Sequence, residues 1–243
     1  MSVVETTLFT VLVVFIAGVL RGFSGFGAGL VLVPTLSLLF NPIEAVITVV
    51  LLEMIPSFQL VPSAISRCHW RSVIPMVLCG VLTVPLGSLL LVKTDADTMR
   101  IVIATLVLTG VVILASGWRF AGSQNYKGPA LTGMVSGLFS GAAGLGGLPV
   151  IMFYLSSGHS SNNARASIVV FLFITVLVSL LTYLLHGIVS VDILMRTVYL
   201  SPIFILAIWV GGKLFGKVSD NVFRAFTLSL LGCVGLMMIL STP

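Results

Sequence analysis

Charged residues are scarce in this sequence. Only 8% of its 243 residues are Asp, Glu, Lys or Arg, whereas 58% are hydrophobic. Soluble domains carry about 25% charged residues, so this composition excludes an ordinary water-soluble protein. The net charge of +5 is small and is dispersed among short polar segments. It therefore offers no basic patch for nucleic acid.

Cysteine and histidine are also rare, with three residues of each. Cys68, Cys79 and Cys233 lack the spacing of a metal site and are interpreted as reduced packing residues. No nucleophile has a spaced histidine and acid, so we expect neither an enzyme nor a bound metal or cofactor. The first apolar run continues without a small-residue cleavage site, which argues against a removed signal peptide.

Long apolar runs are what the chain has instead, and its mean hydropathy is +1.22. The runs cover 7–40, 43–64, 72–92, 99–118, 129–157, 165–186, 191–212 and 221–240. Six of them are close to the roughly 20 residues that an α-helix needs to cross a bilayer. The sequence therefore predicts an all-α polytopic membrane protein. The first and fifth runs are too long for one ordinary span, and each contains a cluster of glycines.

The two halves of the chain resemble each other. A shift of 119 residues places Gly18, Gly22, Gly25 and Gly27 over Gly137, Gly141, Gly144 and Gly146, and Thr48 over Ser167. A shift of 124 residues places Gly87 over Gly211. This series predicts an internal duplication, with residues 1–120 as the first membrane repeat and 121–243 as the second.

Loop charges indicate how the repeats cross the membrane. If the first and fifth runs each cross once, the loop Lys and Arg residues divide five against six between the two sides. If each run enters and returns to the same side, they divide eight against three. The positive-inside rule favours the second arrangement. It predicts two inverted repeats in the cell (inner) membrane, each a glycine-broken deep helical hairpin plus three transmembrane helices, with both termini outside.

A helix broken inside hydrocarbon survives only where it is buried in protein or lines a polar cavity. Two half-helix N-termini that meet near the membrane midplane would direct unpaired N–H groups at one point, which favours an anion. The alternative role of glycine is close helix packing. Packing is favoured at Gly18, Gly22, Gly137 and Gly141. The broken helix is favoured at Gly25, Gly27, Gly144 and Gly146.

Two motifs recur in both halves of the chain. The glycine-rich stretch GFGAG precedes Pro34, and GLGG precedes Pro149. The next helices begin AVIT at Ala45 and ARAS at Ala164. These paired motifs resemble those of the TauE/SafE sulfite exporter family, also called TSUP, although the first copy departs from the family pattern. The resemblance implies a secondary transporter that exports small sulfur-containing anions, such as sulfite, sulfoacetate or other organosulfonates.

Candidate substrate-binding residues lie at the glycine clusters and at the start of the sixth run. They are Arg21, Ser24, Gly25, Gly27, Ser140, Gly144, Gly146, Asn163 and Arg165. The planar guanidinium of Arg21 suits an oxyanion; its alternatives are a lipid headgroup or an ion pair with Glu53. The serines could instead bond their own backbone. Asn163 could instead cap a helix that begins near Ala164, and Arg165 could contact lipid phosphate.

Glu53 lies well inside the second run and is the candidate for proton coupling. Thr48 and Gln59 lie on the same run and are candidates to line a cavity. We expect alternating access around a midplane anion site, with a small sulfur-containing anion and the lipid bilayer as partners. Proton-coupled uptake, a channel-like anion pore and a non-transporting scaffold remain alternatives. Whether the chain forms a homodimer is left open by the sequence.

Overall fold

The computed structural model describes residues 3–25, 27–116, 126–156 and 161–214, and the single positions 229, 232 and 233. These residues form nine α-helices and no strand. They are α1 (Val3–Ser24), α2 (Ala28–Leu39), α3 (Pro42–Ile65), α4 (Trp70–Lys93), α5 (Ala96–Ser116), α6 (Lys127–Ala143), α7 (Gly147–Ser156), α8 (Ser161–Leu185) and α9 (Val191–Leu214). Most of the predicted run 221–240 and the predicted repeat boundary lie outside the described residues.

Six of the described helices are long and apolar enough to cross a membrane. They are α1, α3, α4, α5, α8 and α9, with mean hydropathies of 1.8 to 2.8 over their spans. The prediction of an all-α polytopic membrane protein is therefore confirmed. The inverted orientation of the two repeats stays a prediction.

The first and fifth apolar runs are each interrupted at their glycine cluster, as predicted. α1 ends at Ser24 and α2 begins at Ala28, whereas α6 ends at Ala143 and α7 begins at Gly147. With 12 and 10 residues, α2 and α7 are too short to span a bilayer. Each run is therefore a longer helix followed by a half-helix.

A left-handed glycine makes each interruption. Gly25 has a φ of 83° and Gly144 a φ of 65°, and the two positions are equivalent under the 119-residue shift. The N–H of Gly25 donates to the carbonyl of Arg21 at 2.8 Å, and the N–H of Gly144 donates to that of Ser140 at 2.9 Å. A residue with a Cβ would pay about 1–2 kcal/mol for this conformation. The two helix interruptions therefore have the same backbone geometry.

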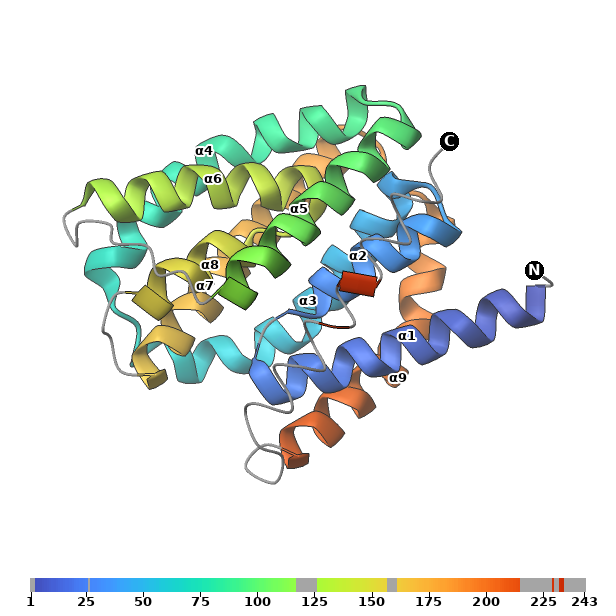
Figure 1. The fold of residues 1–243 in the computed structure, drawn as a ribbon, viewed down its shortest axis with the longest axis horizontal. Helices are drawn as coiled ribbons and strands as arrows, with labels where there is room; N and C mark the ends of the chain where they lie inside the picture. Colours follow the sequence, from blue (N-terminus) through green and yellow to red (C-terminus); the bar gives the residue numbers. More distant parts are fainter. Residues whose placement is uncertain are drawn as a thin grey trace. The chain divides into compact units, whose positions relative to one another are not determined.

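The helices form two compact units. The first unit contains α1, α2, the first part of α3, α5 and α9; the second contains the rest of α3 with α4, α6, α7 and α8. The division passes through α3 after Leu52. Each unit draws helices from both predicted repeats, so the units and the repeats divide the chain differently (Figure 1).

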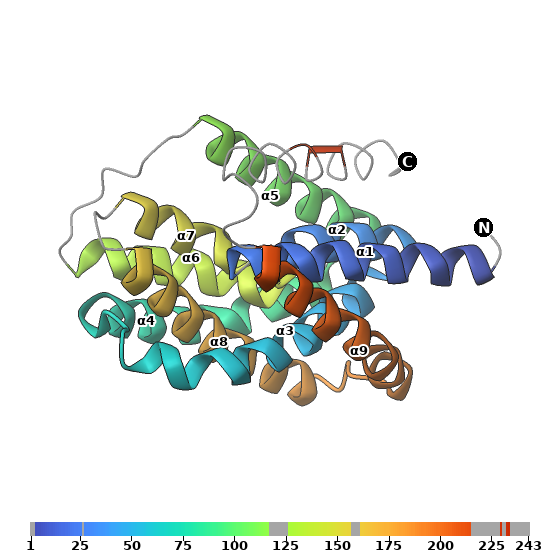
Figure 2. The same cartoon turned by 90° about the horizontal axis from the view of Figure 1, so that it is seen from below.

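In the first unit, α1 packs against α9, and the two helices cross at an angle in both views (Figure 1 and Figure 2). The contact is made through glycines that leave no room for a side chain. A Cβ added to Gly22 would overlap the carbonyl group of Ile208, and one added to Gly211 would overlap that of Val19. α2 packs against α1 and α5. The close approach holds the first glycine turn beside α9.

In the second unit, α4 packs along α6, again through glycines. A Cβ on Gly141 would overlap the carbonyl group of Val84, and one on Gly87 would overlap that of Leu138. α8 covers α4 and also contacts α6 and α7. The second glycine turn is therefore enclosed by α6, α7 and α8.

The two glycine interfaces are equivalent contact for contact. The shift of 119 residues carries Val19 to Leu138 and Gly22 to Gly141, and the shift of 124 carries Val84 to Ile208. The packing interpretation of Gly18, Gly22, Gly137 and Gly141 is therefore confirmed. Each interface pairs one helix from each predicted repeat, which the sequence comparison did not anticipate.

Candidate functional site

Arg21 and Ser140 occupy equivalent positions at the two glycine turns. Their exposed fractions are 3% and 2%, and each backbone carbonyl accepts the N–H of the left-handed glycine that follows. A buried arginine in a membrane segment usually faces a partner or a cavity rather than lipid headgroups. The first glycine turn therefore carries a buried cation at the position where the second glycine turn carries a buried hydroxyl.

The half-helix α2 begins without a side-chain cap. Its N-cap residue is Gly27, with a φ of 95°, and the first hydrogen bond there is the 3.2 Å contact from Leu30 N–H to the carbonyl of Gly27. N–H groups in the first turn of a helix lack intrahelical acceptors, and the helix dipole places partial positive charge there. Both features favour an anion at the start of α2.

The second turn is tied to its neighbours by hydroxyl groups. The Ser136 hydroxyl donates to the carbonyl of Gly146, and the Ser140 and Ser179 hydroxyls lie 3.3 Å apart. The Tyr183 hydroxyl donates to the carbonyl of Gly141 at 2.8 Å. A Cβ on Gly146 would lie 2.8 Å from the Cβ of Ser140. This turn is a neutral, tightly packed polar cluster.

The remaining predicted site residues lie in different surroundings. The Ser24 side chain is outside the described residues. Asn163 and Arg165 are exposed near the start of α8, and Glu53 is half-buried on α3 in the second unit. Since Arg21 belongs to the first unit, an ion pair between Arg21 and Glu53 stays a prediction.

The alternative role of Asn163 as a helix N-cap is wrong. α8 begins at Ser161, so Asn163 lies inside its first turn. The physical reason is that the first-turn N–H groups of α8 lack intrahelical acceptors, so a polar side chain is tolerated inside this turn. Gln59, a candidate to line a cavity, is exposed.

Thr48 differs from its repeat equivalent, Ser167. Both are fully buried. The Ser167 hydroxyl accepts the N–H of His69 at 2.9 Å, whereas the Thr48 hydroxyl has no hydrogen-bond partner in the described part of the chain. A buried unsatisfied hydroxyl costs about 1–3 kcal/mol. Thr48 is thus a polar group that a bound ligand or water would stabilise.

Sequence reasoning missed a polar chain in the second unit. Nδ1 of His69 lies 2.9 Å from the Ser72 hydroxyl, which lies 2.7 Å from that of Tyr154. Only the ARAS motif around Ser167 pointed toward this place. The fold brings His69 and Ser167 together across 98 residues of sequence.

No group of three or more His, Cys, Asp or Glu residues within the described ranges is arranged to hold a metal ion. The groups available at the turns are a guanidinium, hydroxyls and backbone N–H groups. These groups can bind an oxyanion by charge and hydrogen bonds.

Comparison with known protein families identifies a match. The family model described as Sulfite exporter TauE/SafE matches residues 10–238. No curated protein and no solved structure matches the chain significantly. The family match covers nearly the whole chain, including both glycine interruptions, five of the six candidate spans in full and the first span from residue 10 onward. The chain belongs to the TauE/SafE sulfite exporter family and is a multi-pass membrane protein of an anion-exporting transporter family.

Proposed function

We propose that this protein exports small sulfur-containing oxyanions, such as sulfite, sulfoacetate or related organosulfonates, by alternating access. The first glycine turn supplies binding groups, and Arg21 is the cationic contact. The observation that carries the proposal is the burial of Arg21, at 3% exposure, in the last turn of α1 beside left-handed Gly25. Family membership supports the transported class.

The chemistry of these groups fits a sulfonate or sulfite head. A guanidinium presents parallel N–H donors that match two oxygens of such a head, and charge-assisted bonds of this kind are roughly twice as strong as neutral ones. The N–H groups at the start of α2 add donors with no counter-charge. Thr48, which belongs to the same unit, supplies a hydroxyl. A protonated or uncharged analogue would lose most of these interactions.

The membrane potential favours outward transport of the anion. We propose that the protein lies in the cell (inner) membrane with both termini outside, as the loop charges predict. A potential that is negative inside contributes about 2.3 kcal/mol per charge per 100 mV to outward movement of a monoanion. Export therefore needs no coupling ion. Uptake would need one, and the half-buried Glu53 is then the residue to carry the proton.

The test uses the purified full chain in liposomes with labelled sulfite and sulfoacetate, and with a potential set by a potassium gradient and valinomycin. We expect saturable flux, counterflow, and acceleration when the anion-containing side is negative. Arg21→Ala should reduce flux at least tenfold, as expected when a charge-assisted contact is lost. Arg21→Lys should reduce it less. The matched control is Arg67→Ala, because Arg67 is exposed between α3 and α4.

Each alternative predicts a different result. Flux that neither saturates nor shows counterflow would indicate a channel-like pore. Flux that follows a pH gradient and is uncoupled by Glu53→Gln would indicate proton-coupled uptake. Wild-type flux in a folded Arg21→Ala variant would overturn the assignment of Arg21, and the absence of flux for every sulfur anion would overturn the transport proposal.

A further inference from the structure

A cavity of about 450 Å³ lies in the first unit, away from the glycine turns. Its walls come from three parts of that unit: threonines of α1 that include Thr10, Phe40 at the end of α2, and Arg196, Tyr199 and Leu200 of α9. The wall is mainly apolar, with hydroxyls and one guanidinium. Neither Gly25 nor Gly27 lines it, so this cavity is separate from the candidate transport site.

Arg196 is held on two sides. Its guanidinium carbon lies 3.8 Å from the centroid of the Phe40 ring, and its Nη1 donates to Oε2 of Glu44 at 2.9 Å. No other hydrogen bond of Arg196 is formed with the residues that the structure describes. The stacking on Phe40 fixes the plane of the guanidinium. Donors on its other atoms are thus pre-oriented and available to a ligand in the cavity.

The ion pair with Glu44 is a weak competitor for such a ligand. The Glu44 side chain is 41% exposed and that of Arg196 is 22% exposed. Ion pairs that reach solvent contribute little, because water screens them. An oxyanion inside the cavity would meet the same guanidinium on its apolar side, where charge-assisted bonds are stronger. A ligand can therefore displace Glu44 from the guanidinium of Arg196 at a small cost in free energy.

The duplicated scaffold does not require this pair. Under the repeat shifts, Glu44 corresponds to Asn163 and Arg196 to Ser72. The other copy thus makes the same glycine-mediated helix packing without an arginine or an acid at these positions. A structural role in holding α9 to its neighbours is therefore not enough to explain the pair. Arg196 lines the cavity, and Glu44 contacts it from outside the cavity lining.

We propose that this cavity binds an organic oxyanion, a sulfonate or phosphate head attached to a small apolar group, and that Glu44 is an internal competitor for Arg196. The head bonds to Arg196 with hydroxyl support from Tyr199, whereas the Thr10 hydroxyl donates to the carbonyl of Thr6 at 2.8 Å. The apolar group lies against Phe40 and Leu200. The ligand is either a free organosulfonate or the phosphate head of an anionic lipid, since both carry this chemistry.

The test measures binding of benzenesulfonate to the purified full chain in a neutral detergent by isothermal titration calorimetry. All proteins in this test carry Arg21→Ala, so that the candidate transport site does not contribute to the measured binding. Failure of the transport proposal is thereby kept distinct from failure of the cavity proposal. Adding Arg196→Ala should weaken binding about tenfold or more, as expected for loss of a charge-assisted contact. Adding Glu44→Gln should tighten it about three- to tenfold, because the competitor is neutralised while the shape is kept. Sulfate, which has no apolar group, should bind more weakly than benzenesulfonate.

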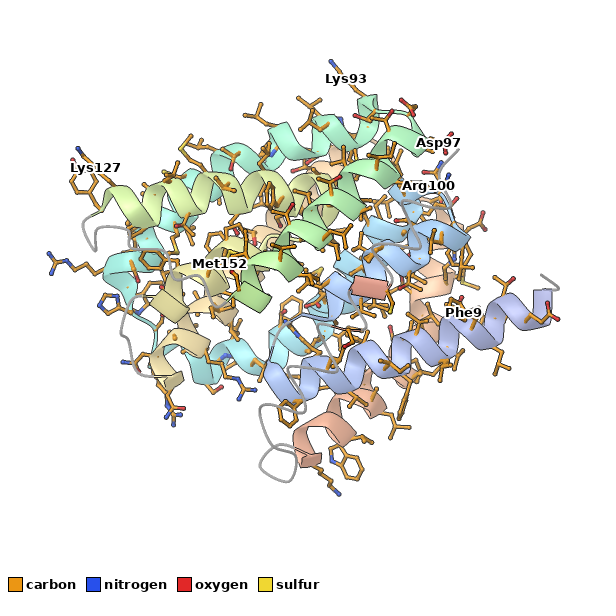
Figure 3. The ribbon with its side chains drawn as sticks, in the orientation of Figure 1. Phe9, Lys93, Asp97, Arg100, Lys127 and Met152 are labelled. Atoms are coloured by element: carbon orange, nitrogen blue, oxygen red, sulfur yellow. The ribbon has the colours of Figure 1, made fainter. Side chains whose placement is uncertain are left out.

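The chain offers a matched control in Asp97→Asn. Asp97 pairs with Arg100 at 2.8 Å in the same unit, and Figure 3 shows the two side chains together at the start of α5. Neither residue lines the cavity. Asp97→Asn removes an acid from an arginine just as Glu44→Gln does, yet it should leave binding unchanged. A gain shared by both variants would show a general charge effect and overturn the proposal.

A second arm distinguishes the ligand sources. Short-chain phosphatidylglycerol and phosphatidylcholine are titrated in the same detergent. Tightening by Glu44→Gln that is confined to phosphatidylglycerol identifies a lipid site, and tightening confined to benzenesulfonate identifies a site for a free anion. The proposal is overturned if folded Glu44→Gln protein binds both probes no better than its parent, or if neither probe binds at all.

Discussion

The carbonyl group of Val84 lies against the α-carbon of Gly141, so closely that a Cβ there would overlap it. Gly22 meets Ile208 in the same way in the other unit. Helices in lipid gain no hydrophobic drive from one another, so they associate through close backbone approach of this kind. These two contacts therefore hold α4 to α6 and α1 to α9. A side chain larger than hydrogen at either position would force the paired helices apart.

Gly141→Ala should destabilise the protein by about 1–3 kcal/mol, because the added methyl forces two backbones apart. Gly22→Ala should cost a similar amount, since the contact is equivalent. Gly212→Ala is the control: it lies on the same helix as the contact residue Ile208, and nothing lies within 4 Å of its added Cβ. That control should be neutral or stabilise the protein by up to about 1 kcal/mol. Thermal unfolding in detergent measures all three, and equal melting temperatures would contradict the interface.

Gly144→Ala should destabilise the second turn through backbone strain. Its φ of 65° costs a residue with a Cβ about 1–2 kcal/mol. Gly144→Asn should cost less, because asparagine visits the left-handed region more readily. The ranking of glycine, asparagine and alanine in melting temperature checks this. We also expect the same ranking in sulfite flux, and a folded alanine variant with full flux would separate the turn from transport.

Asp95 should make the protein lose stability in acid. The N–H of Thr98 donates to the Asp95 carboxylate at 2.8 Å and lowers the pKa of that carboxyl below its ordinary value of 3.8. A pKa lowered by folding contributes stability that is fully present above pH 3.8 and is lost as the pH falls through the folded value. Asp95→Asn should reduce the loss of stability over this acidic pH range. Melting temperatures of both proteins between pH 2 and pH 6 test this prediction. Identical slopes of melting temperature against pH would contradict a stabilising hydrogen bond from Thr98 to Asp95.

Cys68 should react slowly with a maleimide at neutral pH. Burial raises the pKa of its thiol above the ordinary value of 9.0, and a hydrogen bond with Ser167 partly offsets the rise. Ser167→Ala should raise the pKa further and slow labelling at each pH. The measurement is the labelling rate from pH 7 to pH 10 in protein with Cys79→Ala and Cys233→Ala. Labelling of the denatured chain is the control, and equal rates in the folded and denatured states would contradict the burial of the thiol.

Local features of this protein were predictable from local sequence. Run length and the lack of charge predict membrane helices, and the glycine clusters predict where two helices break. Gly25 and Gly144 have the left-handed φ that such breaks need. The burial of Arg21 was also predictable, because an arginine so deep in an apolar run needs a polar or protein environment.

Contacts between distant segments could not be predicted in this way. The glycine spacing indicates that α1 and α6 have packing surfaces, but it does not name α9 and α4 as their partners. Arg196 counted only as a loop charge, although it pairs with Glu44 across 152 residues of sequence and lines a cavity. Nor does the sequence show that the Ser167 hydroxyl is satisfied while that of Thr48 is not.

The sequence by itself determined that the chain is helical, lies in a membrane and breaks two helices at equivalent glycines. These properties depend on hydrophobicity, charge and the missing Cβ of glycine, which act over a few residues. Only the tertiary structure decided that each glycine surface packs on a helix of the other predicted repeat, and that Arg196, Phe40 and Glu44 meet beside a cavity. Such contacts depend on which folded surfaces fit one another, and no short stretch of chain carries that information.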